Sequence, residues 1–296
     1  MTDLTLNRFA SYLDANGAQF DIIDKKIYRC YNKMIVPFGP VEEDYSIDKR
    51  VSKVLMKKNG GILVRHHKPL ISPSVTSSWY AVVCDEFKDL NQMSSKYRSQ
   101  VLRGLNNCEA KRIDASLLKG KGFDIYRSAL ASYRNGGAKS LSKKQFQNEI
   151  NIAKNYDDIV HYWGVFHQNK LIAYSVNLVY DKIEVSYSSI TFNPVHLCFY
   201  PSYALFYEMN RHYLQQEEFK YVSDGYRNLR HKTNIQDYLI KKFAFRKFYL
   251  TLNIDYYYGV EQFVNTIYPI RGLVSKIDGR IGAILKQERI KRSFYE

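Results

Sequence analysis

The chain lacks any uninterrupted apolar segment that approaches the roughly 18 residues of a membrane-spanning helix. Its four cysteines lie far apart and form no CxxC pair, which argues against a structural zinc site and against a disulfide framework. The histidines show no HExxH or comparable metal spacing. The opening segment MTDLTLNRFASYLDANG has no basic stretch followed by an apolar one, as a signal peptide would. We therefore expect a cytoplasmic protein without integral membrane segments and without a bound metal ion.

What the chain does contain is the composition of a folded protein with a basic surface. Hydrophobic residues make up 45% and aromatic residues 15%, including 26 Tyr, which argues against disorder. Lys and Arg number 44 against 29 Asp and Glu, a formal net charge of +15. Such a field attracts polyanions, so nucleotides, tRNA, acyl-CoA and other anionic substrates all fit as partners. A lysine-rich, solvated surface is the alternative explanation.

The first part of the chain predicts a small α/β half over residues 1–118. Helical and strand-like patterns alternate here, which favours a layered arrangement. They lie at 6–16, 27–36, 48–58, 62–66 and 79–84. The Gly60-Gly61 pair separates two of these elements, as glycines in turns commonly do.

The second part, residues 119–296, changes in character from about residue 158. Three alternating apolar segments at 159–166, 171–179 and 183–191 are joined by short polar turns and predict an antiparallel meander. Two helices and two further strands are expected at 201–214, 220–223, 234–245 and 248–257. The last forty residues look helical and basic, so the predicted second domain carries a basic helical C-terminus.

The order of three antiparallel strands, helix, strand, helix and strand resembles the core of the GNAT acyltransferase fold, and its Fem-type branch in particular. In that branch the segment after the central helix reads roughly fDfG, a spacer and FK.kFG. This chain has YVSDG at Tyr221–Gly225 and YLIKKFAFR at Tyr238–Arg246, with Ala244 in place of the last glycine. The resemblance implies an α/β (α+β) fold with a mixed, largely antiparallel sheet flanked by helices. It also implies a tandem of two GNAT-like halves, the first of them a degenerate copy.

The same resemblance implies transfer of an acyl or aminoacyl group to an amine on a carbohydrate or cell-envelope precursor, with polysaccharide biosynthesis as the setting. Acyl-CoA-dependent members have a glycine-rich loop whose backbone N–H groups bind pyrophosphate. The corresponding junction here, SSITFNPVHLCFYPS, has no glycine. The donor therefore stays open between acyl-CoA and aminoacyl-tRNA. Two alternatives are a basic nucleic-acid-binding module and a catalytically degenerate GNAT-fold protein of a polysaccharide cluster.

Two residues are the catalytic candidates. Asp224 follows a buried strand and precedes a glycine, so we interpret it as the base or as the carboxylate that binds the amine, with an Asx-type turn as the structural alternative. Tyr203, near the start of the expected helix, is the candidate acid for the leaving group. Packing is the alternative role for this tyrosine, as for any in so tyrosine-rich a chain.

Five residues are the substrate-binding candidates, namely Tyr187, Ser189, Arg227, Asn228 and Lys242. Arg227 lies in one loop with Arg230, His231 and Lys232, which together offer charge-assisted hydrogen bonds to a phosphate or diphosphate. A solvated basic loop is the alternative. By helical spacing Lys242 lies closer than Lys241 to the apolar stripe, so it is expected to point inward. Strand alternation places Tyr187 and Ser189 on one face.

Overall fold

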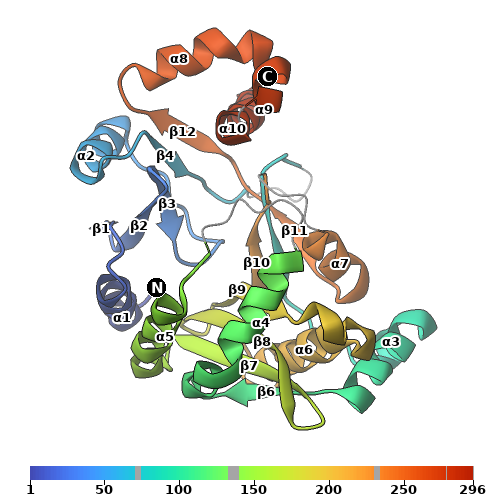
Figure 1. Cartoon of the computed structure of the whole chain (residues 1–296). Coiled ribbons are helices and arrows are strands. Elements are labelled where there is room, and N and C mark those ends of the chain that lie inside the picture. The colour runs from blue at the N-terminus through green and yellow to red at the C-terminus, as the bar shows by residue number, and fades with distance from the viewer. Residues whose placement is uncertain (71–74, 133–139, 230–233, 278, 296) are drawn as a thin grey trace. The chain divides into compact units, whose positions relative to one another are not determined.

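The computed structural model describes residues 1–70, 75–132, 140–229, 234–277 and 279–295 (Figure 1). The α-helices are α1 (Asp3–Ala15), α2 (Lys49–Asn59), α3 (Ser95–Asn107), α4 (Leu118–Ser132), α5 (Lys143–Ala153), α6 (Pro201–Asn210), α7 (Ile235–Lys242), α8 (Val260–Ile267), α9 (Arg271–Ile277) and α10 (Gly279–Tyr295). The strands are β1 (Phe20–Ile23), β2 (Lys26–Tyr31), β3 (Met34–Phe38), β4 (Leu63–His66), β5 (Tyr80–Cys84), β6 (Glu109–Ile113), β7 (Val160–His167), β8 (Lys170–Tyr180), β9 (Glu184–Phe192), β10 (Tyr221–Tyr226), β11 (Arg246–Tyr249) and β12 (Asn253–Tyr256).

The chain forms two compact units, each assembled from segments that are distant in sequence. The first unit comprises residues 1–82, 226–237 and 247–296, and the second comprises 83–225 and 238–246. These units differ from the predicted halves, because residues 83–118 group with the second unit and the C-terminal helices with the first. As a boundary between independently folding domains, residue 118 stays a prediction.

The first unit contains a five-stranded sheet in the order β1-β2-β3-β4-β12. Strands β1 to β3 form an antiparallel meander, β4 runs parallel to β3, and β12 pairs antiparallel with β4. The turn between β1 and β2 places Asp24 and Lys25 at φ values of 47° and 60°, the left-handed conformation that tight two-residue hairpins require. Tyr28, Leu55 and Val64 belong to one buried cluster, so α2 packs against this sheet.

A seven-stranded sheet has the order β11-β5-β10-β9-β8-β7-β6. From β6 to β9 each strand is antiparallel to its neighbour, and β10 runs parallel to β9. The predicted strands at 159–166, 171–179, 183–191 and 220–223 are therefore confirmed as β7 to β10. Two mixed, mostly antiparallel sheets flanked by helices confirm the predicted fold class.

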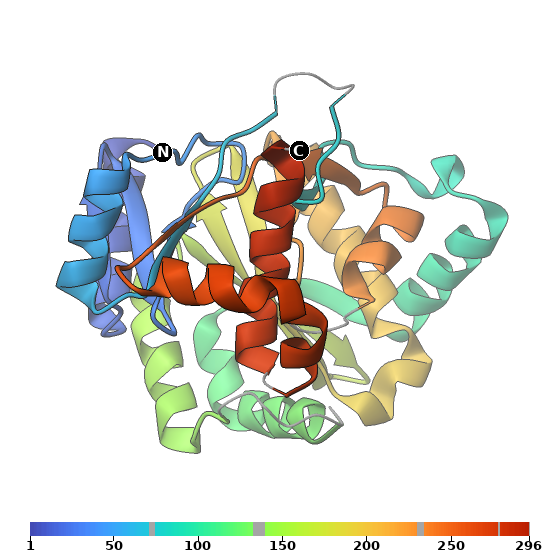
Figure 2. The same ribbon diagram turned by 90° about the horizontal axis from the view of Figure 1, so that it is seen from above.

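Helices cover both faces of the seven-stranded sheet within the second unit (Figure 2). Tyr174 of β8 packs its ring against Phe146 of α5. Asn177, three residues further along β8, contacts Met209 of α6 and Tyr213 instead. Ser175 donates to Asn177, so these two side chains lie on the same face of the sheet, and the adjacent Tyr174 points to the opposite face. Helices α5 and α6 therefore lie on opposite sides of the sheet. The predicted helix 201–214 is α6 followed by a π-helical turn at 211–216.

The same order of elements occurs twice along the chain. In the first unit a helix, three antiparallel strands, a helix and a parallel strand follow one another as α1-β1-β2-β3-α2-β4. In the second unit the corresponding series is α5-β7-β8-β9-α6-β10. The chain thus contains two GNAT-like halves, as predicted. Each fourth strand has on its other side a strand from a distant part of the sequence, β12 beside β4 and β5 beside β10.

Two predicted strands are wrong as single elements. The segment 248–257 divides into β11 and β12, which belong to different sheets. Leu250, Thr251 and Leu252 between them are all buried, and the N–H groups of Leu250 and Thr251 donate to Trp79 and Lys68. Three consecutive buried residues break the alternation of a strand. The segment 27–36 is likewise a hairpin of β2 and β3 rather than one strand.

Candidate functional site

Strands β9 and β10 pair over only three residues and then separate. The parallel ladder joins Glu184–Ser186 to Tyr221–Ser223, whereas β9 continues to Phe192 and β10 to Tyr226. Asp224 is the first residue of β10 beyond this ladder, and it is half-buried. Gly225 has a φ of 72°, and a Cβ built there meets no heavy atom within 4 Å. The strands therefore diverge at Asp224, with open space at the adjacent glycine.

A β-bulge lies in β9 close to this divergence. Val176 of β8 pairs with Ser189, but the next residue, Asn177, pairs with Tyr187, so Ser188 is the extra residue. Because Val176 and Asn177 point to opposite faces of the sheet, Tyr187 and Ser189 do so too. The prediction that these two residues share a face is wrong, since the bulge interrupts the alternation on which it was based.

The two residues consequently have different surroundings. The Tyr187 hydroxyl donates to Oδ1 of Asn210 at 2.7 Å in the interior, and burial raises the pKa of Tyr187 well above its usual value. Ser189 is exposed. Their roles in substrate binding stay predictions, with Ser189 the one accessible to a ligand in this structure.

Tyr203 and Lys242 are brought together on α6 and α7. Lys242 donates to the Tyr203 hydroxyl, which itself donates to Oε1 of Gln100 at 2.7 Å. The ammonium also lies 4.7 Å from the ring centroids of Tyr203 and Tyr238 and 5.7 Å from that of Tyr97. Lys242 is half-buried and Lys241 exposed, as the helical spacing predicts. Cation–π contact and a hydrogen bond thus fix the Lys242 ammonium against Tyr203.

Glu184, at the start of β9, is a site residue that the sequence analysis missed. It is fully buried, and it accepts hydrogen bonds from the Tyr221 hydroxyl at 2.9 Å and from the Ser223 hydroxyl. Tyr221 and Ser223 are the β10 residues that complete the ladder before Asp224. The buried carboxylate therefore joins β9 to β10 immediately before the point where they diverge. A single acidic residue in the apolar strand KIEVSYSS was the available signal.

A buried polar cluster supports the sheet behind this point. The Tyr213 hydroxyl accepts from Nε1 of Trp163 at 2.8 Å and lies 3.1 Å from Nδ1 of His161. Burial lowers the pKa of His161 to about 3, with smaller contributions from Arg112 and His212. Tyr213 belongs to the π-helical turn after α6, an irregularity that is frequent near functional sites. His161 is thus a neutral interior histidine at neutral pH.

The remaining predicted residues follow Asp224 in the chain. Arg227 is half-buried, and its guanidinium donates to the Ser78 carbonyl at 2.7 Å, while Asn228 is exposed. Both belong to the first unit, whereas Asp224 belongs to the second. Their predicted roles in substrate binding therefore stay predictions. Arg230, His231 and Lys232, expected to assist Arg227, lie outside the described residues.

Comparison with solved structures places this geometry in a known fold. The crystal structure of FemX matches with a TM-score of 0.54 and 10% identity over 88% of this chain and 94% of that chain. The chain has a GNAT/Fem-like fold. The C-terminal DUF2156 domain of a protein from Agrobacterium fabrum matches with a TM-score of 0.50 and 12% identity, over 83% and 90% of the two chains. No protein-family model and no curated protein matches the sequence.

In this GNAT/Fem-like fold the N-terminus of α6 follows β9, and here it is closely covered. Pro201 at the first helical position has no N–H, and the N–H groups of Tyr203 and Ala204 donate to the Tyr200 carbonyl. A Cβ built on Gly104 of α3 would lie 2.8 Å from the Tyr200 oxygen and 2.9 Å from the Ala204 nitrogen. Helix α3 therefore packs closely against the first turn of α6, where few backbone amides are left for an anion.

The contact at Gly104 gives a stability prediction. Gly104→Ala should destabilise the protein by about 1–3 kcal/mol, because the methyl group collides with backbone atoms that cannot rotate away. Gly120→Ala is the matched control in α4, since a Cβ there meets nothing within 4 Å. It should stabilise the protein by up to about 1 kcal/mol through helix propensity. Urea unfolding measures both, and equal effects of the two substitutions would contradict the close approach of α3 to α6.

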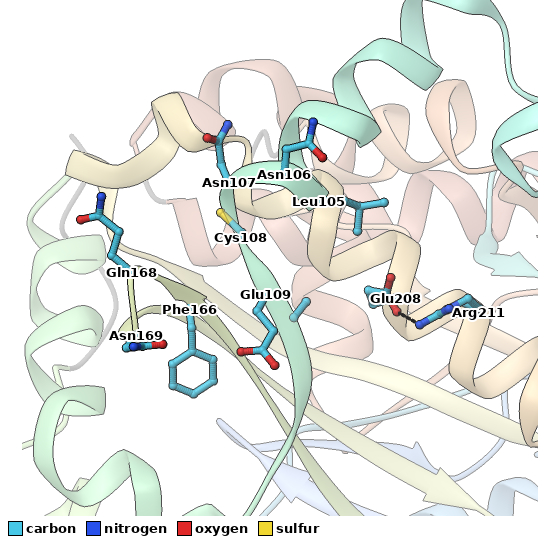
Figure 3. Close-up of a pocket in the computed structure, with 11 residues that line it drawn as sticks. Leu105, Asn106, Asn107, Cys108, Glu109, Phe166, Gln168, Asn169, Glu208 and Arg211 are labelled. Carbon is cyan, nitrogen blue, oxygen red and sulfur yellow. Dashed lines mark hydrogen bonds and ion pairs between the residues drawn. The ribbon is translucent and has the colours of Figure 1, made fainter.

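A pocket of about 630 Å³ lies at the β6 edge of the seven-stranded sheet (Figure 3). Its lining includes Asn107, Glu109, Phe166, Glu208 and Arg211, and the last two form an ion pair with each other. Burial raises the pKa of the neighbouring Cys108 to about 11, so this thiol is not a reactive thiolate at neutral pH. Four strand positions separate β6 from β10, roughly 19 Å at the usual strand spacing. The pocket is therefore separate from the divergence at Asp224.

Two further features are absent from the described residues. No group of three or more His, Cys, Asp or Glu side chains has a metal-binding arrangement within them. Among the helices of that part of the chain, none combines the length and the hydropathy that crossing a bilayer requires.

Proposed function

We propose that this chain is an N-acyltransferase that uses an aminoacyl-tRNA as donor and an amine on a carbohydrate or cell-envelope precursor as acceptor. The GNAT/Fem-like fold suggests an acyltransferase. The observation that carries the proposal is the divergence of β9 and β10, with the carboxylate of Asp224 at its start. A carboxylate at such an opening suits the recognition of an ammonium group and the removal of its proton.

The chemistry is a direct transfer from an ester to an amine. The amine nitrogen attacks the ester carbonyl, the carbonyl oxygen becomes an oxyanion, and the tRNA hydroxyl leaves as the new amide forms. Asp224 holds the amine, accepts the proton that it loses and passes that proton to the leaving tRNA oxygen. Beyond Ser186 the backbone groups of β9 on the side of β10 are released from the ladder. Backbone N–H groups are effective oxyanion donors, so this stretch of β9 is the proposed oxyanion site.

Two observations favour aminoacyl-tRNA over acyl-CoA as donor. Helix α3 packs against the first turn of α6 through Gly104, and Pro201 removes one of the few N–H groups at that end. Few backbone amides are therefore available there to bind pyrophosphate. The net charge of +15 also suits a large polyanion such as tRNA.

The experiment is a transfer assay with matched donors. Total tRNA charged with labelled amino acids should support transfer to amino-sugar acceptors, whereas acetyl-CoA and longer acyl-CoAs should not. Digestion of the charged tRNA with ribonuclease before the assay should prevent transfer of the label. Transfer from an acyl-CoA would contradict the donor and leave the acyltransferase proposal intact. Salt-dependent RNA binding without transfer from any donor would instead favour the nucleic-acid-binding alternative.

A further inference from the structure

A pocket of about 440 Å³ lies wholly within the first unit. It is formed by the start of β5 and the residues just before it, by β11, by the residue after β10 and by the end of α10. Ser77, Ser78, Tyr80, Arg227, Lys247 and Tyr249 line it. Its volume is in the range of pockets that bind small molecules.

Two cations share one aromatic ring in this pocket. The guanidinium carbon of Arg227 lies 5.6 Å and the Lys247 ammonium 4.8 Å from the ring centroid of Tyr80. Tyr249 packs edge-on against the same ring at 6.3 Å. No acidic residue is among the described residues that line the pocket. Both cations line the same pocket, and a bound anion would offset the repulsion between them.

The hydrogen-bond donors around the cations are held in place by the backbone. One guanidinium nitrogen of Arg227 donates to the Ser78 carbonyl at 2.7 Å, and the Arg227 N–H donates to the Tyr80 carbonyl at 2.8 Å. A guanidinium has five N–H donors, so further donors remain for a ligand. The Ser77 hydroxyl accepts from the Trp79 N–H at 3.0 Å, which leaves its own hydrogen available to donate.

We propose that this pocket binds the phosphate or diphosphate group of a small ligand. Arginine presents a planar fork of donors that matches phosphate oxygens, and lysine adds a second positive charge. The Ser77 hydroxyl is a further donor, and Tyr80 holds both cations by their contact with its ring. The inference does not depend on the proposed transfer reaction, because binding is measured without a donor or an acceptor.

The test is calorimetric titration of the full chain with inorganic pyrophosphate in about 0.15 M salt, where long-range attraction is screened. Lys247→Gln and Arg227→Gln should each weaken binding about tenfold or more, the effect of losing one charge-assisted contact. Lys53→Gln removes the same charge from an exposed position on α2 of the same unit. It should leave the affinity within about twofold of the unmodified chain, as expected for a distant surface charge.

Folding controls keep the result interpretable. Lys247 is exposed, so Lys247→Gln is expected to keep the melting temperature unchanged. Arg227→Lys retains the charge but loses the planar fork, and it should bind more weakly than the unmodified chain and more tightly than Arg227→Gln. Equal affinities of all variants, or no heat of binding at all, would overturn the proposal. So would RNA binding that Lys247→Gln abolishes and pyrophosphate does not compete for, which would assign both cations to a nucleic-acid surface.

Discussion

Replacing Asp224 with asparagine is expected to lower the transfer rate by about 100- to 10,000-fold, the range that a positioned acid or base contributes. Asparagine has nearly the same shape, but it has no charge to hold an ammonium group and cannot accept its proton. Asp224 lies half-buried where β9 and β10 separate, not in the core. The free energy of unfolding should therefore change by no more than about 1 kcal/mol.

The control for this prediction is Asp124→Asn. Asp124 is an exposed carboxylate on α4 of the same unit, so the substitution changes the net charge equally without touching the diverging strands. It should leave the transfer rate unchanged. Steady-state rates with saturating donor, together with melting temperatures, measure both variants. Full activity of Asp224→Asn would remove Asp224 from the mechanism while leaving the fold and the donor untouched.

The second large effect concerns pH. Burial lowers the pKa of His161 in the second unit and of His67 in the first to about 3, compared with 6.5 for an unperturbed histidine. Between pH 6.5 and 3 the unfolded chain therefore binds protons that the folded chain does not. The stabilisation is complete above pH 6.5 and is lost as the pH falls towards 3. Each histidine should lower the unfolding free energy by about 2 kcal/mol between pH 7 and pH 5.

Urea unfolding at pH 7 and pH 5 measures this difference. In His161→Gln the loss between the two pH values should be about 2 kcal/mol smaller than in the unmodified chain, whatever the stability at pH 7. His196→Gln is the control, because His196 stacks on Phe199 in a partly exposed position. The comparison separates the effect of burying a histidine from that of losing any histidine. An unaltered difference in His161→Gln would show that His161 is charged in the folded state.

The parts of the fold that sequence predicts well are those with local, regular signals. Strands β7 to β9 follow from the alternation of apolar residues and from short polar turns. The predicted strand 248–257 is wrong because three successive buried residues give no local sign that the chain passes from one sheet to the other. Pairings between distant segments, such as β12 with β4, leave no local pattern.

The candidate site shows the same limits. Asp224 was identified from its neighbours in sequence, but Glu184 was not, because its partners Tyr221 and Ser223 come from a strand that is distant in sequence. Lys247 and Tyr80 were also missed, since nothing in either segment indicates the other. Ala244 stands where the Fem-type pattern has a glycine. Its φ of 60° is the left-handed conformation that favours glycine after a helix, and alanine adopts it here at some cost.

The pairing of β12 with β4 affects how the first unit folds during synthesis. Strand β4 ends at His66, but β12, which pairs with its outer edge, begins only at Asn253. Until β12 has been made, the first sheet therefore has an unpaired edge, which is open to pairing with other chains. Nascent chains in this state are exposed to aggregation and to chaperone binding. The sheet of the first unit can be completed only after β12 has been made.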